Sequence, residues 1–343
     1  MVAETQMTGQ TRGDDMFIFD NVVHVHNFDP SNLIDDLAER ANQNIYTGST
    51  KTFPPELRFG DYQNFAKAWS VEEIHRIVFA ESTTDMVMAQ AVPLYDYWKD
   101  GLAGVERQHE LMKLDPERVV FCGAVDPVYQ GLRTALESMT YQVEVMGAKS
   151  FKFYNGHSAR TSWQADDRDI AYPLYERALE LGITLLQFHK GIPLGMEPVE
   201  SLRPNDLQIP SLDFPDANFV IHHLGIPYQA ETIDIGRRFP NIYLSLSSWI
   251  NYLALRPVPT LMNLGEALFS CGPEKLLWGS EVPLWPAAQP LIDLFLDTQI
   301  PEHQQEGYGH PAITREMQEM IMGGNLARLL GIEIPAEYRK AAV

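Results

Sequence analysis

Residues 17–26 read FIFDNVVHVH, an apolar run that ends in two histidines, His24 and His26, with one valine between them. A short run rich in Phe, Ile and Val predicts a buried β-strand. Residues two apart on a strand point to the same side, so both imidazoles would face one way where the strand ends. Two imidazoles in this position can bind one metal ion, although two histidines also fall at this spacing by chance.

Seven further apolar runs follow, and they alternate with longer segments that have the spacing of amphipathic helices. One helix is expected at 172–181, because Leu174, Ala178 and Leu181 recur at helical spacing before Gly182. This alternation is typical of βα units around a parallel sheet, and eight strands predict an α/β fold of the (β/α)8 TIM-barrel type. The expected strands are residues 17–25, 85–92, 118–125, 148–154, 183–188, 218–222, 241–246 and 275–278.

A single barrel domain is expected at 16–335, between a polar N-terminal tail at 1–15 and a C-terminal tail at 336–343. The length of 343 residues does not require two domains, because such barrels with insertions exceed about 250 residues. The long segment 27–84 separates the first two strands and contains helical patterns near 31–41 and 71–79. An insertion at this place predicts a lid over the active site.

The composition excludes several classes of partner. Asp and Glu outnumber Lys and Arg by 46 to 26, which gives a formal charge of −20 and a surface field that repels nucleic acid. Cys122 and Cys271 match neither a disulfide framework nor a zinc ribbon, so we expect buried thiols in a reducing compartment. The N-terminus has no signal-peptide pattern and the chain has no long apolar run, which predicts a cytoplasmic protein without a membrane partner.

Ligand-type residues also close three other expected strands. His189 follows the fifth strand, the pair His222 and His223 follows the sixth, and Glu281 follows the eighth. Each histidine alone is well explained as a core residue, and adjacent residues face opposite ways, so only one of the pair is expected in the site. Four strand ends that carry such residues on the face where barrel enzymes keep their active sites predict a metal centre.

At this point the sequence resembles the amidohydrolase superfamily, in the branch of aminocarboxymuconate semialdehyde decarboxylase and related decarboxylases, hydratases, lactonases and carbon–carbon hydrolases. The resemblance spans nearly the whole chain and implies a metal-dependent hydrolase fold. It implies that His24, His26 and His189 are metal ligands, that His223 is a catalytic or second metal histidine, and that residue 281 completes the site. The motifs are HVH at 24–26, FH at 188–189, HLG at 223–225, LWGSEVP at 277–283 and GNLARLLG at 324–331.

Two positions depart from the family pattern. The family has Asp at the end of the eighth strand, whereas Glu281 moves the carboxylate outward by about 1.5 Å. This longer side chain could bind bidentately, bridge two ions or displace a water. The family also often has Asp two residues before the first histidine, where this chain has Val22. The number of metal ions is therefore left open at one or two.

Five other residues are candidates for the site. Lys152 and His157, on and after the fourth strand, and His222 are candidate outer ligands or ligands of a second metal, with a buried ion pair as the alternative for Lys152 and a plain loop residue for His157. Trp249 and Trp285 follow the seventh and eighth strands and are candidate substrate-binding residues. Either tryptophan could equally cap the core.

Three imidazoles and a carboxylate leave an open position on a divalent ion, and water bound there loses a proton near neutral pH. The first hypothesis is therefore a hydrolase of a small organic acid, ketone, lactone or amide, in which His223 or Glu281 moves protons. Zinc is the expected metal, with iron or manganese as alternatives.

Two other functions remain open from the sequence. A decarboxylase of a hydroxylated or unsaturated carboxylic acid would use the same residues. A non-haem dinuclear iron or manganese oxygenase, or a partner subunit of an active homologue, is suggested by the longer carboxylate of Glu281. The expected partners are a small-molecule substrate and a second copy of the chain, with a homologous subunit as an alternative.

Overall fold

The computed structural model describes residues 16–52, 58–156, 162–195 and 197–338. At its centre lies an eight-stranded parallel sheet whose strands follow one another in sequence order. All eight expected strands are present, and each end lies within two residues of its expected position. The strands are β1 (Phe19–Val23), β2 (Met86–Gln90), β3 (Val119–Gly123), β4 (Ser150–Phe153), β5 (Leu185–Phe188), β6 (Asn218–Ile221), β7 (Ile242–Ser245) and β8 (Leu276–Leu277).

The sheet closes on itself through the segment that follows β8. The Asn21 amide donates to the Trp278 carbonyl at 3.2 Å, and the His24 amide donates to the Val282 carbonyl at 2.9 Å. These bonds place the first strand beside the end of the last one. The (β/α)8 barrel expected from the sequence is therefore confirmed.

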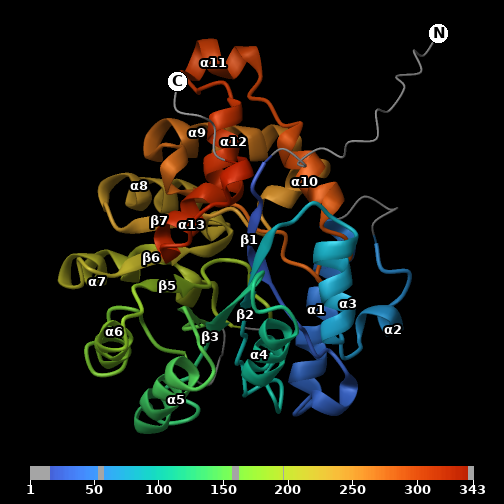
Figure 1. Cartoon of the computed structure of the whole chain (residues 1–343), viewed down its shortest axis with the longest axis vertical. Coiled ribbons are helices and arrows are strands. Elements are labelled where there is room, and N and C mark those ends of the chain that lie inside the picture. Colours follow the sequence, from blue (N-terminus) through green and yellow to red (C-terminus); the bar gives the residue numbers. More distant parts are fainter. Residues whose placement is uncertain (1–15, 53–57, 157–161, 196, 339–343) are drawn as a thin grey trace.

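Helices surround the barrel (Figure 1). The helix expected at 172–181 is confirmed as α6 (Ala171–Glu180), which buries Leu174 and Ala178 against the strands. The other helices in the described ranges are α1 (Asp36–Thr52), α2 (Tyr62–Phe65), α3 (Val71–His75), α4 (Val105–Leu114), α5 (Leu132–Glu144), α7 (Gln208–Asp213), α8 (Gln229–Arg238), α9 (Pro257–Cys271), α10 (Gln289–Leu296), α11 (Glu302–Tyr308), α12 (Arg315–Glu319) and α13 (Asn325–Leu330).

The two sides of the strands have different chemistry. On β4, Phe151 and Phe153 pack in the apolar layer beneath the helices, whereas Lys152 points into the barrel. There the Lys152 ammonium donates to Gln90 Oε1 at 3.0 Å, and the Gln90 amide donates to Gln187 Oε1 at 3.1 Å. Buried polar groups must be paired, and these bonds pair them. The result is a rigid polar layer in the barrel interior.

Part of the segment between β1 and β2 lies beside the strand ends that carry the histidines, because Ile45 shares a cavity wall with His24 and His189. Its first helix, α1, buries Ala38, Ala41 and Ile45 on one side, against a cluster that includes Phe28 and Phe65. That the segment forms a lid over the site stays a prediction.

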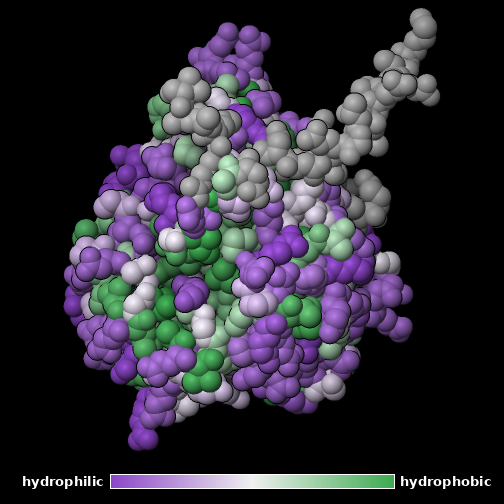
Figure 2. Space-filling model, in the orientation of Figure 1, coloured by the Kyte–Doolittle hydropathy of each residue, from purple (hydrophilic) through white to green (hydrophobic). Residues whose placement is uncertain are grey.

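Figure 2 shows that hydrophilic residues dominate the rim of the visible face, whereas hydrophobic residues gather nearer its centre. Within the described residues, no helix combines the length and the apolar character needed to span a membrane. The expected C-terminal tail begins with a 3-10 turn at Ala336–Tyr338, and the Tyr338 hydroxyl donates to Asp85 Oδ1 at 2.8 Å.

Candidate metal centre

A small cavity where the strands end collects four of the predicted ligands. His24 and His26 enter it after β1, His189 after β5 and Glu281 after β8. About 20 Å³ of the cavity is open to the centre of a water molecule, which is room for about one water. The remaining wall is formed by Ile45, Val92, Leu102, Tyr154, Leu194 and Leu284.

A backbone carbonyl fixes the His24 ring. Nδ1 of His24 lies 2.7 Å from the carbonyl oxygen of Gln90, and because this oxygen can only accept, Nδ1 carries the proton. Nε2 of His24 then faces Oε1 of Glu281 at 3.5 Å. Nε2 donates to this oxygen when the ring is protonated, and when the ring is neutral two electron-pair donors stand opposite one another.

The Glu281 side chain is almost fully buried and ionised. Burial raises its pKa, but the neighbouring His223, His24 and Lys152 lower it by more, to about 2. Its Oε2 atom has no hydrogen-bond partner among the described residues, and the residue lies in the left-handed region at φ 67°. A strained residue with an unpaired buried oxygen is a common mark of a functional site.

The rings of His189 and His223 form a second facing pair. Nε2 of His189 donates to the Ile192 carbonyl at 3.2 Å, and Nδ1 of His223 donates to the Ser247 carbonyl at 3.0 Å. These two bonds turn the lone pair of His189 Nδ1 toward that of His223 Nε2, at 3.2 Å. A shared proton or a metal ion is needed to hold two such lone pairs together.

The spacing within each pair suits a metal. In a tetrahedral zinc site with bonds of about 2.0–2.1 Å, two ligand atoms lie about 3.3 Å apart. Metal-binding histidines also commonly donate their second nitrogen to a carbonyl, as His24, His189 and His223 do. Across the described ranges, however, no three His, Cys, Asp or Glu side chains gather around one point. The residues fit a divalent ion by donor type and pairwise spacing, and they stand as two facing pairs.

His26 lies against the first of these pairs. Its ring stacks on that of His24 with centroids 4.7 Å apart, and its buried Nδ1 has no hydrogen-bond partner among the described residues. Burial, and then the charges of His24 and Arg107, lower its pKa well below the usual value. The ring is therefore neutral at pH 7, which is the form that binds metals.

Lys152 and His222 lie outside this cavity wall. Lys152 is buried in the polar layer, where burial lowers its pKa to about 7 against the opposing effect of Glu281. His222 points into the same layer and bonds through Nε2 to Gln187 Oε1 at 2.8 Å, while His223 turns to the site. His157 lies outside the described residues.

A second, outer space adjoins the first. It offers about 90 Å³ to water centres and is bounded by α1, by the loops after β5, β7 and β8, and by Trp285. Ile45, Leu194 and Leu284 line both spaces. Trp249 is placed in the main apolar core and lines neither space.

Two residues of this region were not expected from the sequence. Tyr154 lines the inner cavity with its ring 4.8 Å from that of His189. Asp20 is fully buried on β1, and its Oδ1 accepts from the amides of Val22 and Ser280, both at 2.9 Å. An aspartate inside an apolar strand was the available signal. Asp20 ties the first strand to the residue before Glu281.

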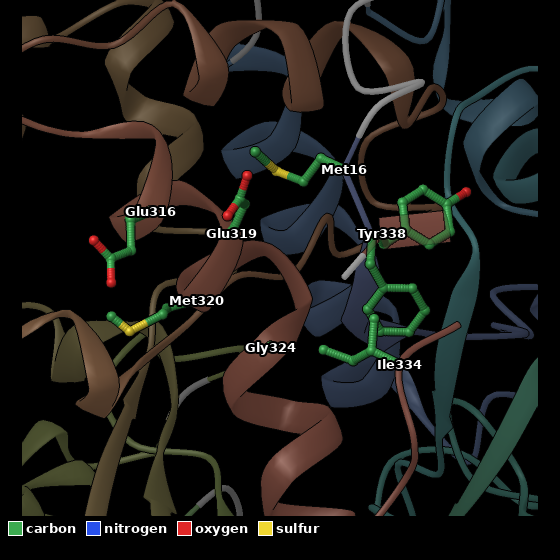
Figure 3. Close-up of a pocket in the computed structure, with 8 residues that line it drawn as sticks. Met16, Glu316, Glu319, Met320, Gly324, Ile334 and Tyr338 are labelled. Carbon is green, nitrogen blue, oxygen red and sulfur yellow. The ribbon is translucent and has the colours of Figure 1, made fainter. Parts of the chain in front are cut away.

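A larger hollow lies elsewhere (Figure 3). It is lined by Met16 and Phe17, which precede β1, and by Glu316, Glu319, Met320, Gly324, Ile334 and Tyr338. It shares no described residue with the cavity of the four ligands. None of the described residues that line it is a histidine, so we assign the candidate site to the smaller cavity on its chemistry.

Comparison with known proteins identifies the family. The family model described as amidohydrolase matches residues 75–332, about three quarters of the chain. The chain belongs to the amidohydrolase family. Members of this family are typically metal-dependent enzymes. No curated protein matches the chain in sequence.

Solved barrel structures share the fold at low identity. An uncharacterised TIM-barrel protein of Bordetella bronchiseptica is 20% identical, with a TM-score of 0.66 over 92% of this chain and 99% of that one. An amidohydrolase of Burkholderia multivorans with bound zinc is 16% identical, with a TM-score of 0.58 over 92% and 100%. The 5-carboxyvanillate decarboxylase of Sphingomonas paucimobilis is 14% identical, with a TM-score of 0.58 over 93% and 100%.

Asp20 gives this amidohydrolase a testable pH dependence. Burial raises its pKa from 3.8 to about 7, against the bonds from Ser280 and Val22. The protonated form is thus favoured by folding, so the stability it supports is complete below about pH 4 and is lost as pH rises through 7. Relative to wild type, Asp20→Asn is expected to gain up to about 4 kcal/mol in free energy of unfolding between pH 4 and pH 8.

Urea unfolding at several pH values measures this difference. The exposed Asp216→Asn serves as the control and should run parallel to wild type. If the free energy of unfolding of Asp20→Asn also ran parallel to that of wild type across this pH range, the pKa of Asp20 would be the ordinary one.

Proposed function

We propose that this chain is a metal-dependent hydrolase that acts on a carbonyl group of a small molecule. The observation that carries the proposal is the set of facing electron-pair donors beside a cavity with room for about one water. Hydrolysis needs a water molecule held next to a base and an electrophile, and this cavity provides the space for it.

His24, His26, His189 and Glu281 are the proposed ligands, with zinc as the first candidate and iron or manganese as alternatives. When bound, a divalent ion would act as a Lewis acid on a carbonyl oxygen and lower the pKa of a water. The carbonyls of Gln90 and Ile192 hold the rings of His24 and His189 in the tautomer that such an ion requires.

His223 is proposed to move the proton. Its Nδ1 donates to the Ser247 carbonyl, so Nε2, which faces His189, is the nitrogen proposed to take a proton from the attacking water and to return it to the leaving group. Its position 3.2 Å from His189 keeps it at the edge of the proposed ligand set. The Tyr154 ring and the apolar wall exclude bulk water from this step.

Decarboxylation of a carboxylic acid is the second candidate, because it would use the same ligands and His223 as the proton donor to carbon. The water-sized inner cavity favours hydrolysis. An oxygenase would depend on iron or manganese and on oxygen.

The decisive experiment is product analysis in water enriched in oxygen-18. Zinc-loaded protein is incubated with small esters, lactones, amides and hydroxybenzoates, and the products are examined by mass spectrometry. We expect acid products that carry one heavy oxygen, together with no release of carbon dioxide and no oxygen uptake; protein treated with a chelator is the control. Release of carbon dioxide without incorporation of the label would replace hydrolysis by decarboxylation, and oxygen uptake would replace it by oxygenation.

A further inference from the structure

The inner and outer spaces lie next to each other. They share the side chains of Ile45, Leu194 and Leu284. The inner space has room for about one water, so the body of a larger substrate whose carbonyl reaches Glu281 would contact these apolar side chains and extend toward the adjoining outer space.

The lining of the two spaces has an acidic side chain but no lysine or arginine among the described residues. Among the described residues that line either space, Glu281 carries the only carboxylate. The outer space is lined by Asn44, Ile45, Gly48, Ser49, Ile192, Pro193, Leu194, Ser248, Tyr252, Leu284 and Trp285.

The basic side chains nearby already have hydrogen-bond or ion-pair partners. Lys190, next to His189, forms a buried ion pair with Asp206 at 2.7 Å. Arg107 donates to the carbonyls of Val25 and Trp69. Lys152 donates to Gln90 beneath the site. Freeing any of them for a substrate would leave a buried partner unsatisfied, which is costly.

We propose that this site selects a small, mainly apolar substrate that carries at most one negative charge, and that it rejects dicarboxylates. The inference rests on the proposed function, because a divalent ion together with the Glu281 carboxylate would retain one positive charge, enough to balance one anionic group. A second carboxylate would have to leave water, and the described residues that line the two spaces offer no lysine or arginine to receive it. The formal charge of −20 adds to this penalty.

Three probes with the same ring test the inference on the zinc-loaded, full-length protein: acetophenone, benzoate and benzene-1,3-dicarboxylate, which are neutral, singly charged and doubly charged at pH 7.5. Calorimetric titration is expected to show binding of the first two probes. The dicarboxylate should bind at least tenfold more weakly than benzoate.

Gly48 on α1 allows the converse experiment. A Cβ added at Gly48 would meet no neighbouring atom within 4 Å, so a longer side chain fits there. Glycine is also a poor helix former, so its replacement does not weaken α1. Gly48→Arg places a cation at the outer space and is expected to strengthen dicarboxylate binding at least tenfold while acetophenone binding changes little. Gly48→Met, an uncharged side chain, is the matched control and should keep the wild-type ratio of benzoate to dicarboxylate affinity.

Equal binding of dicarboxylate and benzoate by the wild type, or failure of both acetophenone and benzoate to bind, would overturn the inference. Zinc content measured on the same samples separates it from the proposed function. A zinc-loaded protein that prefers the dicarboxylate contradicts the inference alone, whereas a protein that retains no zinc contradicts the proposed function. In that case the relative affinities for acetophenone and the dicarboxylate still test whether the lining rejects a doubly charged molecule.

Discussion

Replacing His24 and His26 together with alanine is expected to leave the purified protein with less than a tenth of the wild-type metal content. The two imidazoles are stacked at the end of β1, and Nε2 of His24 stands 3.5 Å from Glu281. Removing both leaves one imidazole and one carboxylate of the proposed set, too few for tight binding of a divalent ion. Elemental analysis by mass spectrometry after dialysis measures the effect.

The exposed His303→Ala on α11 is the matched control, since it removes a histidine without touching the cavity. Circular dichroism verifies that the double variant keeps its helices. A folded double variant that still holds one metal per chain would place the ion elsewhere and end the proposed ligand assignment.

His223→Asn is expected to lower turnover by about 100- to 10,000-fold while the metal content stays unchanged. Asparagine is chosen for two reasons. His223 has φ 59°, a left-handed conformation that asparagine tolerates, and an asparagine amide can still donate to the Ser247 carbonyl. The variant therefore removes chiefly the nitrogen that is proposed to carry the proton.

Two readouts distinguish proton transfer from a structural role. The pH profile of turnover should lose the limb that belongs to His223, and the metal content should match that of wild type. Loss of the metal in His223→Asn would make His223 a ligand instead, and turnover within threefold of wild type would remove it from the reaction.

The barrel was predictable because both faces of its strands are buried, so the strands are mainly apolar. Runs such as 118–125 and 183–188 are apolar, short and bounded by helix-like segments, and these features do not depend on distant residues. The strands proved shorter than expected at most ends. On β1 the pairing with β2 shifts register between Asp20 and Val23, so an apolar run need not be a regular ladder throughout.

The site was predictable only in its outline. The ends of parallel strands meet on one face, so His24, His26, His189 and Glu281 could be expected in one place, and they line one cavity. The sequence could not predict which carbonyl fixes each ring, because Gln90 lies 66 residues from His24. It also could not predict the role of Asp20, which depends on contact with Ser280 across the closing joint of the barrel.

The short segment after β8 does two things at once: it completes the ring of strands, and it carries Glu281. A cation bound by both Glu281 and His24 would link the end of the barrel to its first strand. A ligand that binds only the folded form raises the free energy of unfolding. The stability of the whole barrel would then depend on the concentration of that ion.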